Sequence, residues 1–590
     1  MTVTQTPAMP THLPISRWSI SSLVDDRPVP RPLLMITALA VAVLYAILWS
    51  GHYYPLSDSS LYLTVAKGLA SGEGFNFIRQ THRSIRPITP LLLAGIVKCG
   101  GGIGAMHAVM IVLTLVSLGL MFLTVRRWFN ERTAYVVTLL TSLGWWTYAN
   151  AFTIMTEPAF LLFMWGSLLA LSHVHTATRR NRWVLVTVGA ILMGGAWGNR
   201  VAAMLLVPGT LFGLYMSCRK VATWREMAGW LAIFAIIGGL CVYDYYRPVP
   251  SASAEASAGG GIKDVGDTDV ALKAESGYRL NSMVGVTHPI VQMPVNAGRW
   301  VLETLAAGFV FPFNSTNKLI VVAGALLSLF TLLLLIVGAI RLLRSGYWWP
   351  VGLLTYFVPL WYLWGTRVKP RYMVPIAPIL FVAVWVGASV LWNWAGKRLR
   401  ARRGENTPTP SYRLGGNVAI AAILLASLVL NGAAYGVEVY LRRFTPYDFY
   451  DQARQGGFAE LVDICGYLRK NTPADTDVWI NRGASRRIIG LLCDREVHTV
   501  RKEVGLQNPQ DSKHFQRFLA FAKGPYLIAL YDQRKWPQFH LPLAQPAPEG
   551  APPRWWQLYK VDPVTRELHP IAVPRDREYM RDLLTPTAHP

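Results

Sequence analysis

Charged residues are scarce in this chain, and their scarcity argues against an ordinary soluble globular protein. Only 15% of its 590 residues are Asp, Glu, Lys or Arg, whereas 52% are hydrophobic and the mean hydropathy is +0.30. A soluble domain needs about a quarter of its residues charged. The composition is therefore typical of a membrane protein.

Cysteine is also rare, and the five cysteines do not have the spacing of metal ligands. The C-terminal region contains no glycine-rich nucleotide-binding loop and no cluster of metal-ligating residue types. Cys465 and Cys493 both lie in that region. They could form a disulfide in an oxidising compartment, or they could be two unrelated free thiols.

The N-terminal region lacks the pattern of a cleavable signal peptide. Residues 1–32 are polar and proline-rich, and the apolar run 33–50 has no small-residue cleavage site after it. We therefore expect residues 1–32 to be a tail and residues 33–50 to be a permanent first span.

Long apolar runs dominate the rest of the chain. About eleven of them are long enough to cross a bilayer; they lie near 33–50, 103–125, 133–150, 157–174, 183–198, 201–217, 227–243, 318–340, 348–364, 372–392 and 417–437. We place a break at Gly198-Asn199-Arg200, because one fused span there would reverse the orientation of everything that follows.

The net charge of +24 looks at first like that of a nucleic-acid-binding protein. The loops after alternate spans are basic, however, as in "RRWFNER" and "CRKVATWR", whereas the opposite connection "NAFTIM" has no Lys or Arg. The positive-inside rule then predicts a cytoplasmic N-terminus and an extracytoplasmic C-terminal region. We expect a multi-pass protein of the inner (plasma) membrane that faces the periplasm and has no nucleic-acid partner.

The predicted fold is an α-helical polytopic membrane protein with a small C-terminal α/β domain. It divides into a cytoplasmic tail (1–32), a membrane domain (33–437) with long outer loops at 51–102 and 244–317, and an extracytoplasmic domain (438–590). In the last part "DVWINR" and "PYLIALYD" predict strands, and "FAELVDICGYLRKN" and "SKHFQRFLAFAK" predict helices.

The stretch "YYPLSDSSLYLTVAKGLASGEGF" (53–75) opens the first outer loop. It predicts a short helix that lies at the membrane surface and ends at Gly72 and Gly74. The helix would carry an apolar stripe formed by Leu61, Tyr62, Val65, Ala66 and Leu69. Ser57 or Asp58 could cap this helix, and Asp58 considered alone would be its N-cap.

Several motifs then follow in a recognisable order. After Asp58 and Tyr62 come "SGEGF" and "RPITPLLLAGI", and further along "TIMTEPAFLLF", "WGNRVAAMLLVPG" and "KPRYMVPIAPIL". Over residues 33–440 the chain resembles the GT-C superfamily of membrane glycosyltransferases, in particular the protein O-mannosyltransferase and lipid A aminoarabinose transferase group. It departs from many of these proteins at Ser59, where they have a second acidic residue beside the first.

The resemblance implies transfer of a hexose or pentose from a polyprenyl-phosphate donor to an acceptor hydroxyl of a lipid, glycan or protein, with inversion at the anomeric carbon. Asp58 would be the general base. Glu157 would either assist in the site or simply begin a helix. The superfamily includes members with and without a divalent metal, so the sequence leaves a metal open, but the lone Asp58 argues against a tight metal site. The polyprenyl-phosphate sugar would be the co-substrate.

Cations in the outer segments are candidates for holding the donor phosphate, since an arginine fork matches a phosphate group. They are Arg79, Arg83, Arg86, Arg200, Arg367, Lys369 and Arg371. The resemblance favours Arg200 and Arg371, then Arg86 and Arg83. The alternative for each is a side chain that snorkels to lipid headgroups. Other predicted substrate contacts are Tyr62, Tyr372 and His288.

Two functions of other classes compete with this one. A lipid or sugar flippase would also have many spans, but it would place charges near the bilayer midplane and contain inverted repeats, of which the sequence gives no clear sign. A non-catalytic assembly protein, whose exterior domain binds a partner, would tolerate the loss of Asp58.

Overall fold

The computed structural model describes most of the predicted membrane domain and parts of the C-terminal region. The described residues are 28–53, 56–74, 76–77, 80–81, 86–246, 318–358, 372, 374–403, 432, 435–436, 439–440, 458–473, 476, 478–480, 486–495, 497–499, 526–530, 556–561, 568–575, 577–578, 580 and 583. The chain forms two compact units. Unit 1 comprises Met1–Leu44, Leu113–Ala149 and Glu157–Tyr435, and unit 2 comprises Tyr45–Val112, Asn150–Thr156 and Gly436–Pro590.

Unit 1 is built of helices. Its elements, some of which extend into unit 2, are α1 (Arg31–Ile47), α4 (Ile103–Trp128), α5 (Glu131–Leu143), α6 (Trp145–Ala151), α7 (Glu157–Ser172), η2 (Val174–Thr176), α8 (Arg179–Trp197), η3 (Val201–Leu206), α9 (Val207–Cys218), α10 (Trp224–Tyr246), α15 (Lys318–Arg344), α16 (Trp348–Leu354) and α18 (Ala377–Arg403). Five helical segments in the described part of the chain are long and apolar enough to cross a bilayer. The protein is therefore a multi-pass membrane protein.

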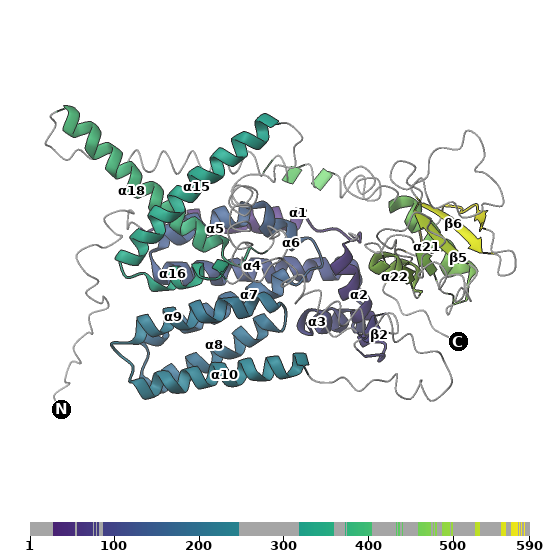
Figure 1. The fold of residues 1–590 in the computed structure, drawn as a ribbon, viewed down its shortest axis with the longest axis horizontal. Helices are drawn as coiled ribbons and strands as arrows, with labels where there is room; N and C mark the ends of the chain where they lie inside the picture. The colour runs from purple at the N-terminus through teal and green to yellow at the C-terminus, as the bar shows by residue number, and fades with distance from the viewer. Residues whose placement is uncertain are drawn as a thin grey trace, which may run out of the picture. The chain divides into compact units, whose positions relative to one another are not determined.

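Glycines let pairs of these helices pack backbone against backbone. Helices α15 and α18 cross each other (Figure 1). Gly338 and Gly387 lie at their contact, and a Cβ on Gly387 would collide with the carbonyl oxygen of Leu334. Helices α9 and α16 meet in the same way at Gly209 and Gly352. Small residues are the usual means of close packing in membranes, where no hydrophobic force drives helices together.

The predicted break at Gly198-Asn199-Arg200 is confirmed, since α8 ends at Trp197 and η3 begins at Val201. The prediction of one continuous span at 133–150 is wrong. Gly144 has an extended backbone with a ψ of 130°, so the chain divides there into α5 and α6. An extended residue cannot continue the i to i−4 hydrogen bonds of a helix.

Two later predicted spans also differ from the structure. Helix α16 ends at Leu354, so 348–364 is not one helix, and α18 begins at Ala377 rather than at 372. Pro375 and Pro378 favour that later start, because proline fits the first turn of a helix and not its interior. The span at 417–437 lies mostly outside the described residues, and the total of eleven stays a prediction.

The first outer loop, in unit 2, contains α2 (Ser57–Ala70), α3 (Ile88–Lys98) and a hairpin of β1 (Asn76–Phe77) and β2 (Gln80–Thr81). The predicted stripe on α2 is confirmed: Leu61 and Val65 are buried, with Tyr62 and Leu69 packed against them. Gly72 and Gly74 have φ angles of +87° and +80°, a conformation that favours glycine and ends the helix.

The C-terminal region of unit 2 contains a sheet of strand order β4-β3-β5-β6-β7. Strand β3 (Val478–Ile480) pairs in parallel with β4 (Val497–Thr499) and β5 (Tyr526–Leu530), while β6 (Trp556–Val561) and β7 (Leu568–Ile571) continue it antiparallel. The two predicted strands and the helix at α21 (Phe458–Asn471) are confirmed. "SKHFQRFLAFAK" lies outside the described residues. The domain boundaries and an extracytoplasmic position for this region stay predictions.

All five cysteines are free thiols in the structure. Cys465 on α21 and Cys493 on α22 (Arg486–Cys493) are both buried and lie within hydrogen-bonding distance of each other. Burial raises the pKa of the Cys465 thiol. The two cysteines are thus neighbours rather than unrelated residues.

Gly387→Ala and Gly239→Ala should have opposite effects on the stability of unit 1. Alanine is a better helix former than glycine by about 1 kcal/mol, which favours both variants. At Gly387 the added Cβ collides with a backbone carbonyl, whereas at Gly239 of α10 nothing lies within 4 Å of it. We expect Gly387→Ala to lower stability by about 1–3 kcal/mol, as overpacking does. Thermal unfolding in detergent measures this, and equal melting temperatures for the two variants would contradict the close contact.

Candidate functional site

Asp58 lies in the first turn of α2. The alternative that it is the N-cap is wrong, because Leu56 holds that position and the Ser59 hydroxyl accepts a hydrogen bond from the Leu56 amide at 3.3 Å. Asp58 is instead the second residue of the helix, near the positive end of the helix dipole. An acidic side chain in the first turn stabilises a helix.

A cation from the C-terminal region contacts this carboxylate. Nη1 of Arg487, on α22, donates to Oδ1 of Asp58 at 3.2 Å. The Arg487 and Asp58 side chains are 27% and 32% exposed, so solvent and small molecules can reach the pair. Sequence analysis did not single out Arg487, which lies 429 residues from Asp58 and carries no motif.

Two other predicted residues of the first outer loop are described, one on α2 and one just before α3. Tyr62 is half-buried one helical turn after Asp58, and Arg86 is buried just before α3. An arginine is seldom buried unless its charge is compensated, so this one is a notable feature of the loop. Tyr53 is also buried; its hydroxyl shares a hydrogen bond with Ser60, and burial raises the pKa of Tyr53.

Unit 1 contains a second cluster, formed by Glu157, Arg200 and Tyr372. Glu157 is the first residue of α7 and Arg200 stands at the break between α8 and η3, where the two side chains form an ion pair. Glu157 is 1% exposed and Arg200 12%. The guanidinium of Arg200 lies over the Tyr372 ring, 5.2 Å from its centroid. Glu157 thus both begins a helix and takes part in a buried ionic cluster.

Tyr356 belongs to this cluster too, although sequence analysis did not identify it. Its side chain is fully buried, and Arg200, Tyr372 and Glu157 all lie within electrostatic range of it. Its hydroxyl has no hydrogen-bond partner among the described residues. A buried hydroxyl is normally hydrogen-bonded, so the Tyr356 hydroxyl is a notable feature of this cluster.

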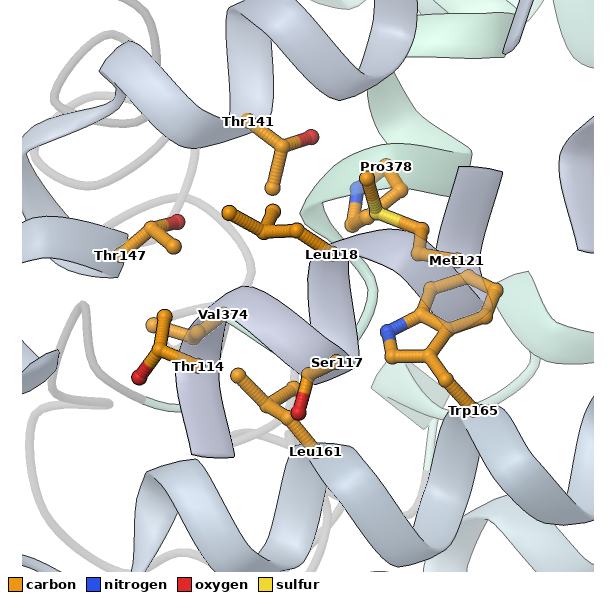
Figure 2. A pocket seen from close by; sticks show the side chains of 10 residues that line it. All are labelled: Thr114, Ser117, Leu118, Met121, Thr141, Thr147, Leu161, Trp165, Val374 and Pro378. Carbon is orange, nitrogen blue, oxygen red and sulfur yellow. The ribbon is translucent and has the colours of Figure 1, made fainter. Parts of the chain in front are cut away.

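A small cavity lies elsewhere in unit 1 (Figure 2). Four hydroxyl side chains and several apolar ones line it: Thr114, Ser117, Thr141, Thr147, Leu118, Met121, Leu161, Trp165, Val374 and Pro378. Its volume is about 10 Å³, which holds about one water molecule. The cavity is too small for a sugar or a lipid phosphate and has none of the predicted site residues in its wall.

Six predicted site residues lie outside the described residues, so their roles stay predictions: Arg79, Arg83, His288, Arg367, Lys369 and Arg371. Asp58 and Glu157 belong to different units and are described separately. In the part of the chain that the structure describes, no three His, Cys, Asp or Glu side chains gather where they could hold a metal ion.

Comparison with known proteins identifies the fold. No protein-family model and no curated protein matches the chain. Among solved structures, the oligosaccharyltransferase of Archaeoglobus fulgidus in the apo form is 11% identical, with 84% of this chain and 69% of that one covered and a TM-score of 0.53. The same enzyme tethered to an acceptor peptide with the NVT sequon gives 10%, the same coverage and a TM-score of 0.52.

ArnT from Cupriavidus metallidurans, bound to undecaprenyl phosphate, is 14% identical over 85% of this chain and 94% of that chain, with a TM-score of 0.50. The chain shares the GT-C fold. The resemblance stated from the sequence is thereby confirmed at the level of the fold.

Glu157→Gln should destabilise unit 1 strongly, because it leaves the buried guanidinium of Arg200 without its counter-charge. Removal of one partner of a buried ion pair typically costs about 3–5 kcal/mol. The double variant Glu157→Gln/Arg200→Met should be markedly more stable than Glu157→Gln alone. Unfolding in detergent provides the free energies for this comparison.

Arg179→Gln serves as the control, since Arg179 is 77% exposed and its partner Glu226, which is 4% exposed, keeps two hydrogen bonds from Thr223 when Arg179 is removed. Loss of an exposed partner costs about 0–1 kcal/mol. Equal losses for Glu157→Gln and Arg179→Gln would contradict a buried pair.

Proposed function

We propose that the protein is an integral membrane glycosyltransferase of the inner membrane. It transfers a hexosyl or pentosyl group from a polyprenyl-phosphate donor to an acceptor hydroxyl on the extracytoplasmic face, with inversion. The observation that carries the proposal is the partly exposed Asp58 carboxylate in the first turn of α2, in a chain with the GT-C fold. The likeness to ArnT bound to undecaprenyl phosphate supports a lipid-phosphate donor.

Asp58 acts as the general base. As the acceptor oxygen attacks the anomeric carbon, its proton passes to the Asp58 carboxylate, and the bond from the anomeric carbon to the phosphate oxygen breaks. The electron pair of that bond leaves with the lipid phosphate. The Asp58 side chain lies in the first turn of α2 and beside Arg487, and a carboxylate is the form that can accept the proton.

Cations stabilise the leaving phosphate. We assign this role to Arg200, Arg371, Arg86, Arg83 and Lys369. A guanidinium has five N–H donors, so Arg200 can keep its bond to Glu157 and still donate to a phosphate oxygen. Tyr372, which lies against Arg200, fixes the orientation of that guanidinium. Tyr62 and His288 are proposed sugar or acceptor contacts.

The basic loops support the proposed orientation, with the N-terminus in the cytoplasm and the C-terminal region outside. Segment 244–317 would cover the site, and the C-terminal domain would recognise the acceptor, whether lipid, glycan or protein. The proposal assigns no step to a divalent metal.

The buried Glu157–Arg200 pair favours one other candidate, a lipid or sugar flippase. Ionisable residues buried within membrane helices often mark the path of a transported substrate. A flippase would move the polyprenyl-linked sugar across a vesicle membrane and leave its bond to phosphate intact.

Asp58→Asn should abolish sugar transfer. Membranes with the wild-type protein or the variant are supplied with a panel of radiolabelled polyprenyl-phosphate sugars, and the label released from the carrier is measured. Loss of a general base should slow transfer by about 10²–10⁴-fold.

Arg200→Lys should retain more activity in the same assay than Arg200→Ala. Lysine keeps the positive charge of arginine, although it lacks the planar fork that grips phosphate.

Glu73→Gln is the matched control, since Glu73 is an exposed carboxylate in the same loop and should be dispensable. Full transfer by Asp58→Asn at equal protein levels would remove Asp58 as the base and direct attention to Glu157. If vesicles that contain the protein move the intact donor across their membrane and release no label from it, the flippase is established instead.

A further inference from the structure

Two ion pairs join α22 to α2. The cation comes from α22 in one pair and from α2 in the other. Arg487, near the start of α22, bonds Asp58 near the start of α2 at 3.2 Å. Asp494, just after α22, bonds Lys67 near the end of α2 at 2.7 Å, and Arg469 lies 3.7 Å from the same Asp494 oxygen. The two helices therefore run in the same direction, with one pair at each end of their contact.

Apolar packing and the second pair together account for the attachment of α22. Its central side chains Ile488, Ile489, Leu491 and Leu492 are buried. The Lys67–Asp494 pair is also the more enclosed of the two, with exposures of 12% and 24%. Helix α22 is therefore attached to α2 mainly by its apolar packing and by the Lys67–Asp494 pair, and the hydrogen bond from Arg487 to the proposed base is additional to these.

We propose that Arg487 is a positioning residue for the transfer reaction, so that the C-terminal region completes the catalytic site around Asp58. This inference rests on the proposed function. The hydrogen bond from Arg487 to Oδ1 fixes the rotation of the Asp58 carboxyl group. A base must point at the hydroxyl proton, and a displacement of about 1 Å can slow a reaction about 10²-fold.

Arg487→Ala should therefore lower kcat about 10–100-fold and leave the KM for the donor within a factor of about two, because Arg487 acts through the base. Arg487→Lys should recover part of kcat, since it restores a cation beside Asp58 without the planar fork. The measurement is steady-state transfer with the donor that the wild-type protein uses, in purified full-length protein of known melting temperature.

Asp494→Asn is the matched control. It breaks the other ion pair of the same contact, and its φ of +54° is one that Asn adopts readily. We expect a lower melting temperature with nearly wild-type kcat. Equal losses of kcat in Asp494→Asn and Arg487→Ala, with equal losses of melting temperature, would mean that Arg487 only attaches α22 and would overturn the proposal.

Two further outcomes separate this proposal from the function on which it rests. Wild-type transfer that Asp58→Asn abolishes and Arg487→Ala leaves unchanged would overturn the role of Arg487 alone. Transfer that survives Asp58→Asn would remove Asp58 as the base, and the role of Arg487 with it. No transfer by the wild-type protein from any donor would remove the proposed function, and the role of Arg487 with it. A rise in KM with kcat unchanged would replace positioning by substrate binding.

Discussion

A charge inside a membrane protein must meet an opposite charge, and this constraint shapes the centre of unit 1. The pair of Glu157 and Arg200 joins the start of α7 to the break between α8 and η3. An unpaired guanidinium would be too costly there. The ion pair therefore holds the start of α7, the end of α8 and the start of η3 in one arrangement. The side chains of Tyr372 and Tyr356 lie near that pair.

The same constraint explains why the helices are interrupted where the polar side chains gather. A continuous apolar helix carries its charges only at its ends, whereas a break provides additional helix ends between apolar segments. Arg200 stands at such a break, and Tyr356 follows the early end of α16. Helices α9 and α16, which flank these breaks, touch at Gly209 and Gly352, where the backbones come too close for any larger residue.

Sequence patterns predicted the features that depend on local order. The stripe of α2 follows from periodicity, and its end follows from glycine. The break before Val201 follows from the orientation of the basic loops after it, which one fused span would reverse. Arg487 could not be found in this way, because only tertiary packing brings it to Asp58. Tyr356 was missed because it lies in an apolar run where a buried tyrosine is unremarkable, and Gly144 because composition alone does not reveal a helix break.

The pairing of α2 with α22 also has a consequence for how the protein is made. Asp58 leaves the ribosome more than 400 residues before Arg487, as their separation of 429 in the chain requires. Every intervening membrane helix is synthesised, and its insertion begun, before the carboxylate can find its partner. The nascent protein therefore carries Asp58 and Lys67 without their C-terminal counterparts for most of its synthesis. A chain cut short after the last membrane span would be inserted but unfinished.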